Sequence, residues 1–276
     1  MIFYHIKPAF INGDNMNRNQ RAKKILEHLH ECGFCKVEEL ENILEASIPT
    51  IYRDLNDLAS RNLIVKVHGG IELPQGNLAL DESVNSRHLL RLAKNRLGKE
   101  QIAAKAINLV NDDDIIFADS STTVYYFIRR LLDNHAIYSN LTIVTNSGAI
   151  IRELSDPPPS ITLIALGGVY NAKLNSFLGR IAINAVKQLH ISKAFISAAA
   201  ISTTEAYTFH ENHAEFLEQV TGYADRSWLL ADHLKFETKA VFPIRRTADF
   251  TGVISDNELS QNIIAKYLAA GINFIL

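Results

Sequence analysis

Ser47-Ile48-Pro49-Thr50-Ile51-Tyr52-Arg53-Asp54-Leu55 is the stretch that decides the fold of the N-terminal part of the chain. Ser47 is a favourable N-cap residue, because its hydroxyl can accept a hydrogen bond from a free amide of the first helical turn. Apolar residues then recur at steps of three and four, which predicts one buried face of a helix: Ile48, Ile51, Leu55 and Leu58. The opposite face carries a mostly polar set near the helix start: Pro49, Thr50, Tyr52, Arg53 and Asn56.

A second, shorter helix is predicted directly before it, over Val37 to Leu44, with the tight connection Glu45-Ala46 between the two. This spacing is typical of a helix-turn-helix, in which the first residues of the second helix meet base edges in the major groove. The same pattern also fits an ordinary helical hairpin or a protein–protein module. The exposed Thr50, Tyr52 and Arg53 favour DNA over both.

The segment after the long helix has the pattern of a β-hairpin. Leu63 to Val67 is β-branched and strand-like, His68-Gly69-Gly70 supplies a turn, and Ile71 to Leu73 returns. A hairpin at this place is a wing, and it would bring Lys66 and His68 to the phosphate backbone.

From Asn19 to Leu73 the chain resembles the DNA-binding domain of the DeoR family of bacterial transcriptional regulators. The resemblance rests on Ser-x-x-Thr-Ile-x-Arg-Asp-Leu (47–55) and Lys-Val-His-Gly-Gly (66–70). Tyr52 and Lys66 depart from it, since the family usually has arginine at the first position and commonly at the second. The resemblance implies a winged helix-turn-helix on double-stranded operator DNA. The expected DNA-binding residues are Ser47, Pro49, Thr50, Tyr52, Arg53, Lys66 and His68.

Composition bounds the remaining function classes. The 276 residues carry a net charge of −2, and no apolar run approaches the roughly 20 residues of a membrane helix. No secretion signal pattern is present at the N-terminus, so we expect a cytoplasmic protein without a membrane partner. Residues 17–75 hold eight Lys and Arg against nine Asp and Glu. The segment therefore lacks the net positive charge that is usual in DNA-binding domains. This favours a homodimer or homotetramer, in which several weak half-site contacts together give tight binding.

The cysteines Cys32 and Cys35 form a Cys-x-x-Cys pair between the first two helices. Such a pair can be a redox couple or half of a zinc site, and His28, His30 and His68 could supply further ligands. No second cysteine pair exists, however, so we expect incidental packing and no bound metal. Residues 1–16 match no pattern and are expected to be a disordered extension, with Met16 as a possible native start. The winged domain is expected over 17–73, a linker over 74–90 and an effector-sensing domain over 91–276.

The second part of the chain alternates short apolar strands with helices, which predicts an α/β domain with a mostly parallel sheet covered on both faces. The expected strands are 115–118, 141–145, 161–166, 194–197, 228–231 and 252–255. The expected helices are 98–110, 124–132, 148–154, 181–189, 211–224 and 260–270.

Ligands bind such sheets at the carboxyl ends of the strands, where three polar loops are expected here. These loops are Asp119-Ser120-Ser121-Thr122-Thr123, Asn146-Ser147 and Gly167-Gly168. The first leads into a helix, whose amides and dipole favour an anion such as phosphate. An N-capping loop with surplus hydroxyls is the alternative.

The DeoR resemblance extends over Arg91 to Asp256 and implies a sensor domain similar in fold to ribose-phosphate isomerases, controlled by a phosphorylated sugar. It rests on Lys99, on the three loops and on Asp232-His233-Leu234-Lys235-Phe236. Ser121 replaces a family glycine and Leu234 a serine. Lys235 joins the three loops as an effector-binding candidate, able to hold a phosphate as a point charge.

We therefore expect a DNA-binding regulator, a repressor of a carbohydrate-utilisation operon, with no cofactor and no catalytic residues. The alternatives are an activator, or a sugar-phosphate isomerase with an appended helix-turn-helix. His210 and His213 flank Glu211, but they lack the i, i+4 spacing of a helical metal pair.

Overall fold

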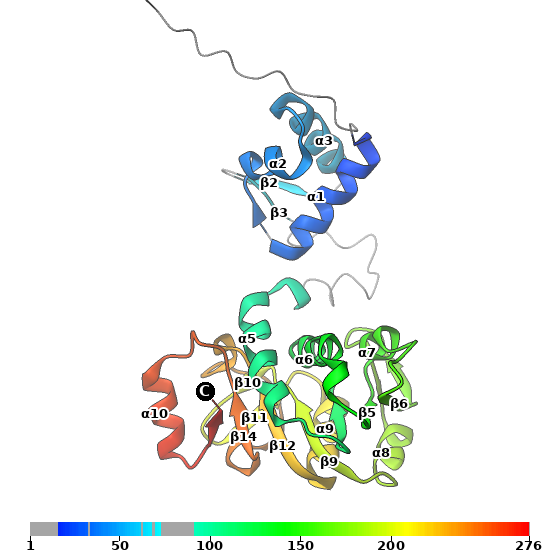
Figure 1. Ribbon diagram of the computed structural model, residues 1–276. Helices are drawn as coiled ribbons and strands as arrows, with labels where there is room; N and C mark the ends of the chain where they lie inside the picture. Colours follow the sequence, from blue (N-terminus) through cyan, green and yellow to red (C-terminus); the bar gives the residue numbers. More distant parts are fainter. Residues whose placement is uncertain (1–15, 33, 62, 68–69, 73–90, 276) are drawn as a thin grey trace, which may run out of the picture. The chain divides into compact units, whose positions relative to one another are not determined.

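The computed structural model describes residues 16–275 apart from 33, 62, 68–69 and 73–90. Two compact units divide the chain, residues 1–82 and 83–276 (Figure 1). The expected extension before Met16 and the whole of the expected linker lie outside the described residues, as does His68. No helix in the described part is both long and apolar enough to span a bilayer.

The first unit is a three-helix domain with a small antiparallel sheet. Its elements are α1 (Arg18–Cys32), β1 (Phe34–Cys35), α2 (Val37–Leu44), α3 (Ile48–Ser60), β2 (Val65–Val67) and β3 (Gly70–Glu72). The sheet order is β1-β3-β2, so the expected wing hairpin gains a third strand that the sequence pattern did not indicate. The winged helix-turn-helix is confirmed.

The core of this unit follows the apolar periodicity. Ile25 and Leu29 of α1 pack with Leu40 of α2 and with Ile51 and Leu55 of α3, and all five are fully buried. Burying a leucine or isoleucine contributes about 1.5–3 kcal/mol. Because these residues come from all three helices, the same packing fixes the position of α3 within the unit.

The second unit is built on a seven-stranded, entirely parallel sheet, which confirms the expected α/β class. Its strands are β4 (Ile115–Ala118), β5 (Leu141–Thr145), β6 (Ile161–Ala165), β9 (Ile191–Ile196), β12 (Ala224–Leu230), β14 (Gly252–Ile254) and β15 (Phe274–Ile275). The strand order is β15-β14-β12-β9-β4-β5-β6. Strands β4 and β5 have the predicted bounds, and β15 was not predicted.

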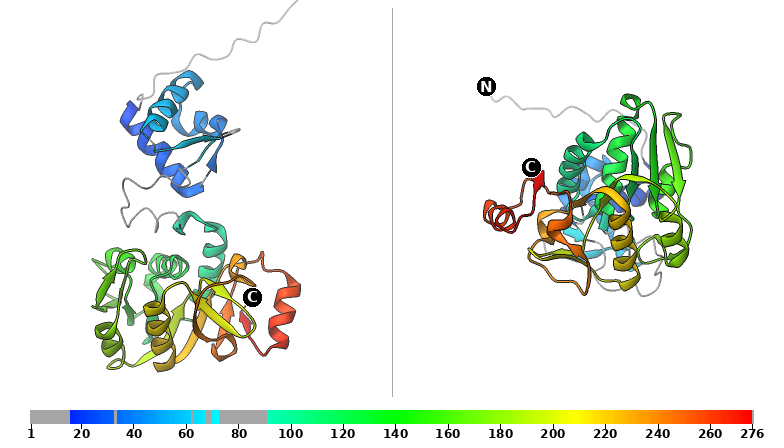
Figure 2. Two further views of the ribbon diagram at one scale, coloured as in Figure 1. Left: turned by 180° about the vertical axis from the view of Figure 1, so that it is seen from behind. Right: turned by 90° about the horizontal axis from the view of Figure 1, so that it is seen from below.

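Helices cover both faces of this sheet (Figure 2). One face packs on α5 (Arg96–Ala106), α6 (Thr122–Asp133) and α7 (Gly148–Glu153); the other packs on α8 (Arg180–Val186), α9 (Glu211–Tyr223) and α10 (Gln261–Ala269). Short 3-10 helices lie at Ile107–Leu109, His135–Ile137, His233–Lys235 and Thr247–Asp249.

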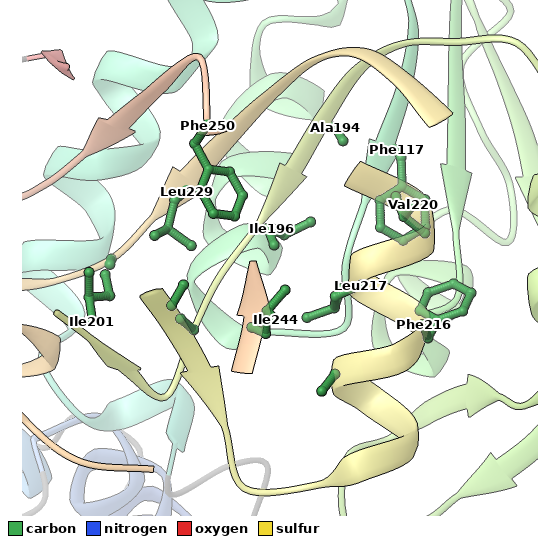
Figure 3. Packing of buried hydrophobic residues seen from close by; sticks show 14 of the residues in the cluster. Phe117, Ala194, Ile196, Ile201, Phe216, Leu217, Val220, Leu229, Ile244 and Phe250 are labelled. Atoms are coloured by element: carbon green, nitrogen blue, oxygen red, sulfur yellow. The ribbon is translucent and has the colours of Figure 1, made fainter. Parts of the chain in front are cut away.

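Side chains alternate between the two cores along each central strand, as a period of two requires. In β9, Phe195 belongs to the core under α5 to α7, while Ala194 and Ile196 belong to the core under α8 to α10. Figure 3 shows the second core, where Leu217 and Val220 of α9 lie near Phe117 and Ile196 of the sheet. Burial on both faces explains why these strands read as continuous apolar runs.

Two small antiparallel sheets were not predicted from the sequence. One is the hairpin of β7 (Val169–Asn171) and β8 (Ser176–Leu178), and the other joins β10 (Ala200–Ile201), β11 (Glu205–Thr208) and β13 (Phe242–Arg246). The predicted helix over 98–110 was too long, since α5 ends at Ala106 and a 3-10 turn follows.

Candidate DNA-binding face and ligand cavity

The start of α3 presents the predicted polar face to solvent. Ser47 is the N-cap residue in backbone conformation, and its hydroxyl pairs with the Thr50 hydroxyl at 3.0 Å and not with a backbone amide. Pro49 lies in the first helical turn, where a missing N–H costs nothing. Arg53 is exposed, and no bond from its guanidinium to another described residue is present. These groups are therefore accessible to a partner.

The wing and α3 touch each other at two points. Lys66 of β2 donates a short hydrogen bond to Oδ1 of Asn56. Its Nζ also lies 5.9 Å from the centre of the Tyr52 ring, within cation–π range. Tyr52, which stands where the family usually has arginine, thus shares a surface with the neighbouring cation.

Asp54, in the middle of the diagnostic motif, has a structural role that the sequence reasoning did not assign. It is 2% exposed and accepts from Arg21 Nε at 2.7 Å and from Arg21 Nη2 at 3.3 Å. This two-pronged ion pair ties α3 to α1. The signal was available, because Asp54 lies on the helix face that also carries Ile51, Leu55 and Leu58.

In the second unit, a cavity of about 200 Å³ opens where β4 runs into α6. Four of the predicted hydroxyl residues line it: Ser120, Ser121, Thr122 and Thr123. Ser121 is the N-cap of α6, with its Oγ accepting from Val124 N at 3.2 Å, and Thr122 donates to the carbonyl of Arg91 at 3.3 Å. The N-capping role and a place in the cavity are therefore both present.

Asp119 does not line the cavity but lies directly behind it. Its carboxylate accepts from Ser121 N at 2.6 Å and from Ser197 N at 2.8 Å, which joins the hydroxyl loop to the end of β9. Full burial raises the pKa of Asp119 to about 6, and the two amide bonds and the charge of Arg91 oppose the rise. Asp119 is thus placed to position the loop.

Cationic side chains gather around the same cavity. Lys235, Arg91, Lys94 and Lys99 line it together with one carboxylate, Asp232. Burial lowers the pKa of Lys99 to about 8 and also lowers the pKa of Lys235, while Asp232 raises both. Four cations against one carboxylate make the cavity suited to an anion.

Among these cations, only Lys235 was a predicted site residue. Lys99 could have been found, since it shares the buried face of α5 with Ile102, Ala103 and Ala106 at steps of three, four and seven. A lysine at such a position calls for a partner in the interior. Arg91 and Lys94 precede α5, and no sequence periodicity marks them as residues of a site.

His213 is the second functional candidate that the sequence reasoning passed over. It is buried on the α9 face that carries Phe216, Leu217 and Val220. Its Nδ1 lies 3.3 Å from Thr208 Oγ1, and its Nε2 has no hydrogen-bond partner within the described part of the chain. Burial, followed by the charges of His210 and Arg91, lowers the pKa of His213 to about 4, so the ring is neutral at pH 7. A neutral imidazole with one unused nitrogen thus lines the cavity.

The other two predicted loops do not reach the cavity, because the β7–β8 hairpin folds over them. Asn146 donates to Ser176 Oγ at 2.8 Å, and Ser147 caps α7 through Ile150 N. Gly168 has φ +155°, and a Cβ there would lie 2.6 Å from the Leu178 carbonyl oxygen. Gly167 and Gly168 thus serve the turn into the hairpin.

Comparison with known families identifies both units. Residues 21–76 match the model of the DeoR-like helix-turn-helix domain, and residues 94–257 match the model of the DeoR C terminal sensor domain. The chain belongs to the DeoR family. It is therefore a DNA-binding transcriptional regulator, and the isomerase alternative is set aside.

Similar DeoR-family proteins align along nearly the whole chain. The lactose phosphotransferase system repressor of Lactococcus lactis subsp. lactis is 27% identical over 91% of this chain and 96% of its own. The L-fucose operon activator of Haemophilus influenzae is 30% identical over 89% of this chain and 94% of its own. Ribose 5-phosphate isomerase A of Methanocaldococcus jannaschii is 18% identical, with a TM-score of 0.37 over 52% of this chain and 55% of that chain.

Proposed function

We propose that this DeoR-family regulator represses a carbohydrate-utilisation operon and that a phosphorylated sugar, bound in the cavity of the sensor domain, controls its affinity for operator DNA. The observation that carries the proposal is the ring of four cations around a hydroxyl-rich helix start. Similar proteins are named as a lactose phosphotransferase system repressor and an L-fucose operon activator. We propose a cytoplasmic homodimer or homotetramer as the active form.

The phosphate end of the ligand is supported by charge and by helix geometry. The free amides at the start of α6, a helix of 12 residues, attract an anion together with the helix dipole. Lys99 and Lys235 supply point charges beside them. Because both amines are largely buried, an anion that pairs with them also relieves the cost of keeping them charged.

The sugar end is supported by neutral hydrogen-bonding groups. Ser120 and Thr208 offer hydroxyls, and His213 offers an imidazole nitrogen without a partner. Such groups match sugar hydroxyls, which both donate and accept. A ligand that hydrogen-bonds to the buried imidazole nitrogen should bind more tightly than a ligand that leaves this nitrogen unpaired.

The DNA contact is tested by fluorescence anisotropy on DNA from upstream of the protein's own gene, at several salt concentrations. We expect Arg53→Ala to weaken selective binding by about 10–100-fold, since a good bidentate base contact contributes about 1–3 kcal/mol. Arg61→Ala is the matched control, because Arg61 is also exposed but lies at the C-cap of the same helix, beside Asp57. An equal loss of selective DNA affinity in both variants would show that Arg53 makes no specific contact with the bases.

The effector contact is tested by adding a panel of phosphorylated and unphosphorylated sugars to the same assay. We expect one phosphorylated sugar to shift DNA affinity by about 5–150-fold, the usual range of coupling between two sites. Lys235→Gln should keep DNA binding and lose most of this shift, while the exposed control Lys239→Gln should keep both. A shift that survives in Lys235→Gln, or that unphosphorylated sugars produce equally, would refute the proposed site.

A further inference from the structure

Three side chains with metal-binding atoms converge in the first unit. They are His28 of α1, Cys35 of β1 and Glu39 in the first turn of α2. One ligand atom of each lies within 4.8 Å of the other two, and Cys35 Sγ lies 3.5 Å from Glu39 Oε2. Residues from three different elements thus meet at one point.

The spacing of these atoms fits a tetrahedral metal centre. With Zn–S at about 2.3 Å and Zn–O at about 2.1 Å, two ligands of a tetrahedron are about 3.6 Å apart. The sulfur–oxygen distance of 3.5 Å already matches this edge. Imidazole, thiolate and carboxylate are also the three ligand types that zinc takes in proteins.

We propose that His28, Cys35 and Glu39 form a zinc site in the DNA-binding unit, with water in the fourth position. Three protein ligands and one water are a coordination that zinc takes in proteins. For Cys35, this proposal replaces the expectation of incidental packing.

Binding requires the Cys35 thiol to lose its proton. The S–H bond breaks, the proton goes to water, and a metal–sulfur bond forms, with no change of oxidation state. Without metal, Cys35 Sγ is 3.2 Å from the Lys36 carbonyl oxygen, and Glu39 accepts from Lys36 N at 3.3 Å. The same Glu39 oxygen, Oε2, lies near Cys35 Sγ and accepts from Lys36 N, and a carboxylate oxygen has enough lone pairs to bind a metal and keep the amide bond.

The site would join the end of α1 to the start of α2 through β1. Leu29 of α1 and Leu40 of α2, one residue beyond Glu39, belong to the core on which α3 packs. Because the unfolded chain does not hold the ligands together, metal binding adds to the stability of this fold. Zinc would therefore stabilise the arrangement that presents α3 to DNA.

The test uses the reduced, untagged full chain, stripped with a chelator and titrated with Co²⁺ as an optical substitute for zinc. We expect one Co²⁺ per chain and a near-ultraviolet thiolate-to-cobalt absorption band that zinc abolishes by displacement. Cys35→Ser should lose the band. A band that is absent with cobalt in excess, or that persists in Cys35→Ser, would overturn the site.

Glu39→Gln keeps the proposal testable if a cysteine variant fails to fold. Glutamine can still accept from Lys36 N, so α2 should form, but cobalt affinity should fall at least about tenfold. The matched control is Glu27→Gln, an exposed carboxylate of α1 outside the cluster. Unchanged affinity in Glu39→Gln, at unchanged circular dichroism, would overturn its role as a ligand.

Discussion

Replacing Lys99 with methionine should make the sensor domain more stable and unresponsive. Lys99 is 3% exposed, and burial lowers its pKa from 10.5 to about 8. A lowered pKa means that the folded state disfavours the charged amine relative to the unfolded chain. Methionine has a similar length and no charge, so it removes this penalty while it fills the same space.

The size of the effect follows from the pKa. A shift of about 2.5 units corresponds to about 3 kcal/mol lost at pH 7, where the amine is charged in both states. The variant also leaves two backbone carbonyls, of Arg91 and Leu92, without the donor that Lys99 supplies, which costs about 1–2 kcal/mol. We therefore expect Lys99→Met to be about 1–2 kcal/mol more stable at pH 7, and to melt about 2–8 °C higher.

The pH dependence of the free energy of unfolding gives a second, independent test of the same argument. Between about pH 8 and 10.5 the unfolded chain binds a proton at Lys99 that the folded chain has released, so the wild-type protein gains stability as the pH rises through this window. The variant lacks this contribution. Its advantage over the wild type should shrink between about pH 7 and pH 10.

Trp228 makes the measurement specific to the sensor domain. It is the protein's one tryptophan, and it is buried in β12 with its ring stacked on Phe195. Urea unfolding followed by its fluorescence gives the free energy of unfolding, with the exposed Lys239→Met as control. A variant that is less stable than the wild type at pH 7, with an unchanged pH slope, would refute the reasoning, and so would a normal effector response.

Two further substitutions, each with a matched control, test the packing of the two units. Asp54→Ala leaves Arg21 without its carboxylate partner and should destabilise the first unit by about 3–5 kcal/mol. The control Asp57→Ala removes a part-exposed carboxylate and should cost no more than about 1 kcal/mol. Hydrogen exchange of the α3 amides measures both, and equal protection in the two variants would contradict the ion-pair argument. Gly168→Ala forces a Cβ against the Leu178 carbonyl at positive φ and should cost about 1–3 kcal/mol by Trp228 fluorescence. Gly167→Ala, with nothing within 4 Å, should cost little, and a reversal of that order would be contrary evidence.

Strands buried on both faces were predictable, because their composition reflects that burial. Ile115–Ala118 and Leu141–Thr145 are short, mostly apolar runs, and the predicted bounds of these two strands agree with the structure. The hairpin strands Val169–Asn171 and Ser176–Leu178 are three residues each and mix apolar with polar side chains, so neither alternation nor apolarity marks them. Their pairing depends on tertiary contacts that a local pattern does not contain.

The same hairpin explains why the predicted ligand loops were only partly brought together. Strand ends in a parallel sheet share an edge, but which of them stays open depends on what covers that edge. Here the side-chain amide of Asn146 donates its hydrogen bonds to Ser176 Oγ and to the Phe177 carbonyl oxygen of the hairpin. Ser120 to Thr123 still line the cavity. Lys99 and His213, by contrast, sit at buried helical positions where a polar residue is costly, and that cost is visible in the sequence.

The contact between Lys66 and the Tyr52 and Asn56 side chains bears on how such regulators diverge. A graft of α3 alone into a relative would separate the aromatic ring from the amine that lies over it, leaving each with a foreign neighbour. Operator preference should therefore transfer only when helix and wing are exchanged together. If Tyr52 contacts DNA as proposed, a change at Tyr52 should be tolerated best when Lys66, fourteen positions away, changes with it.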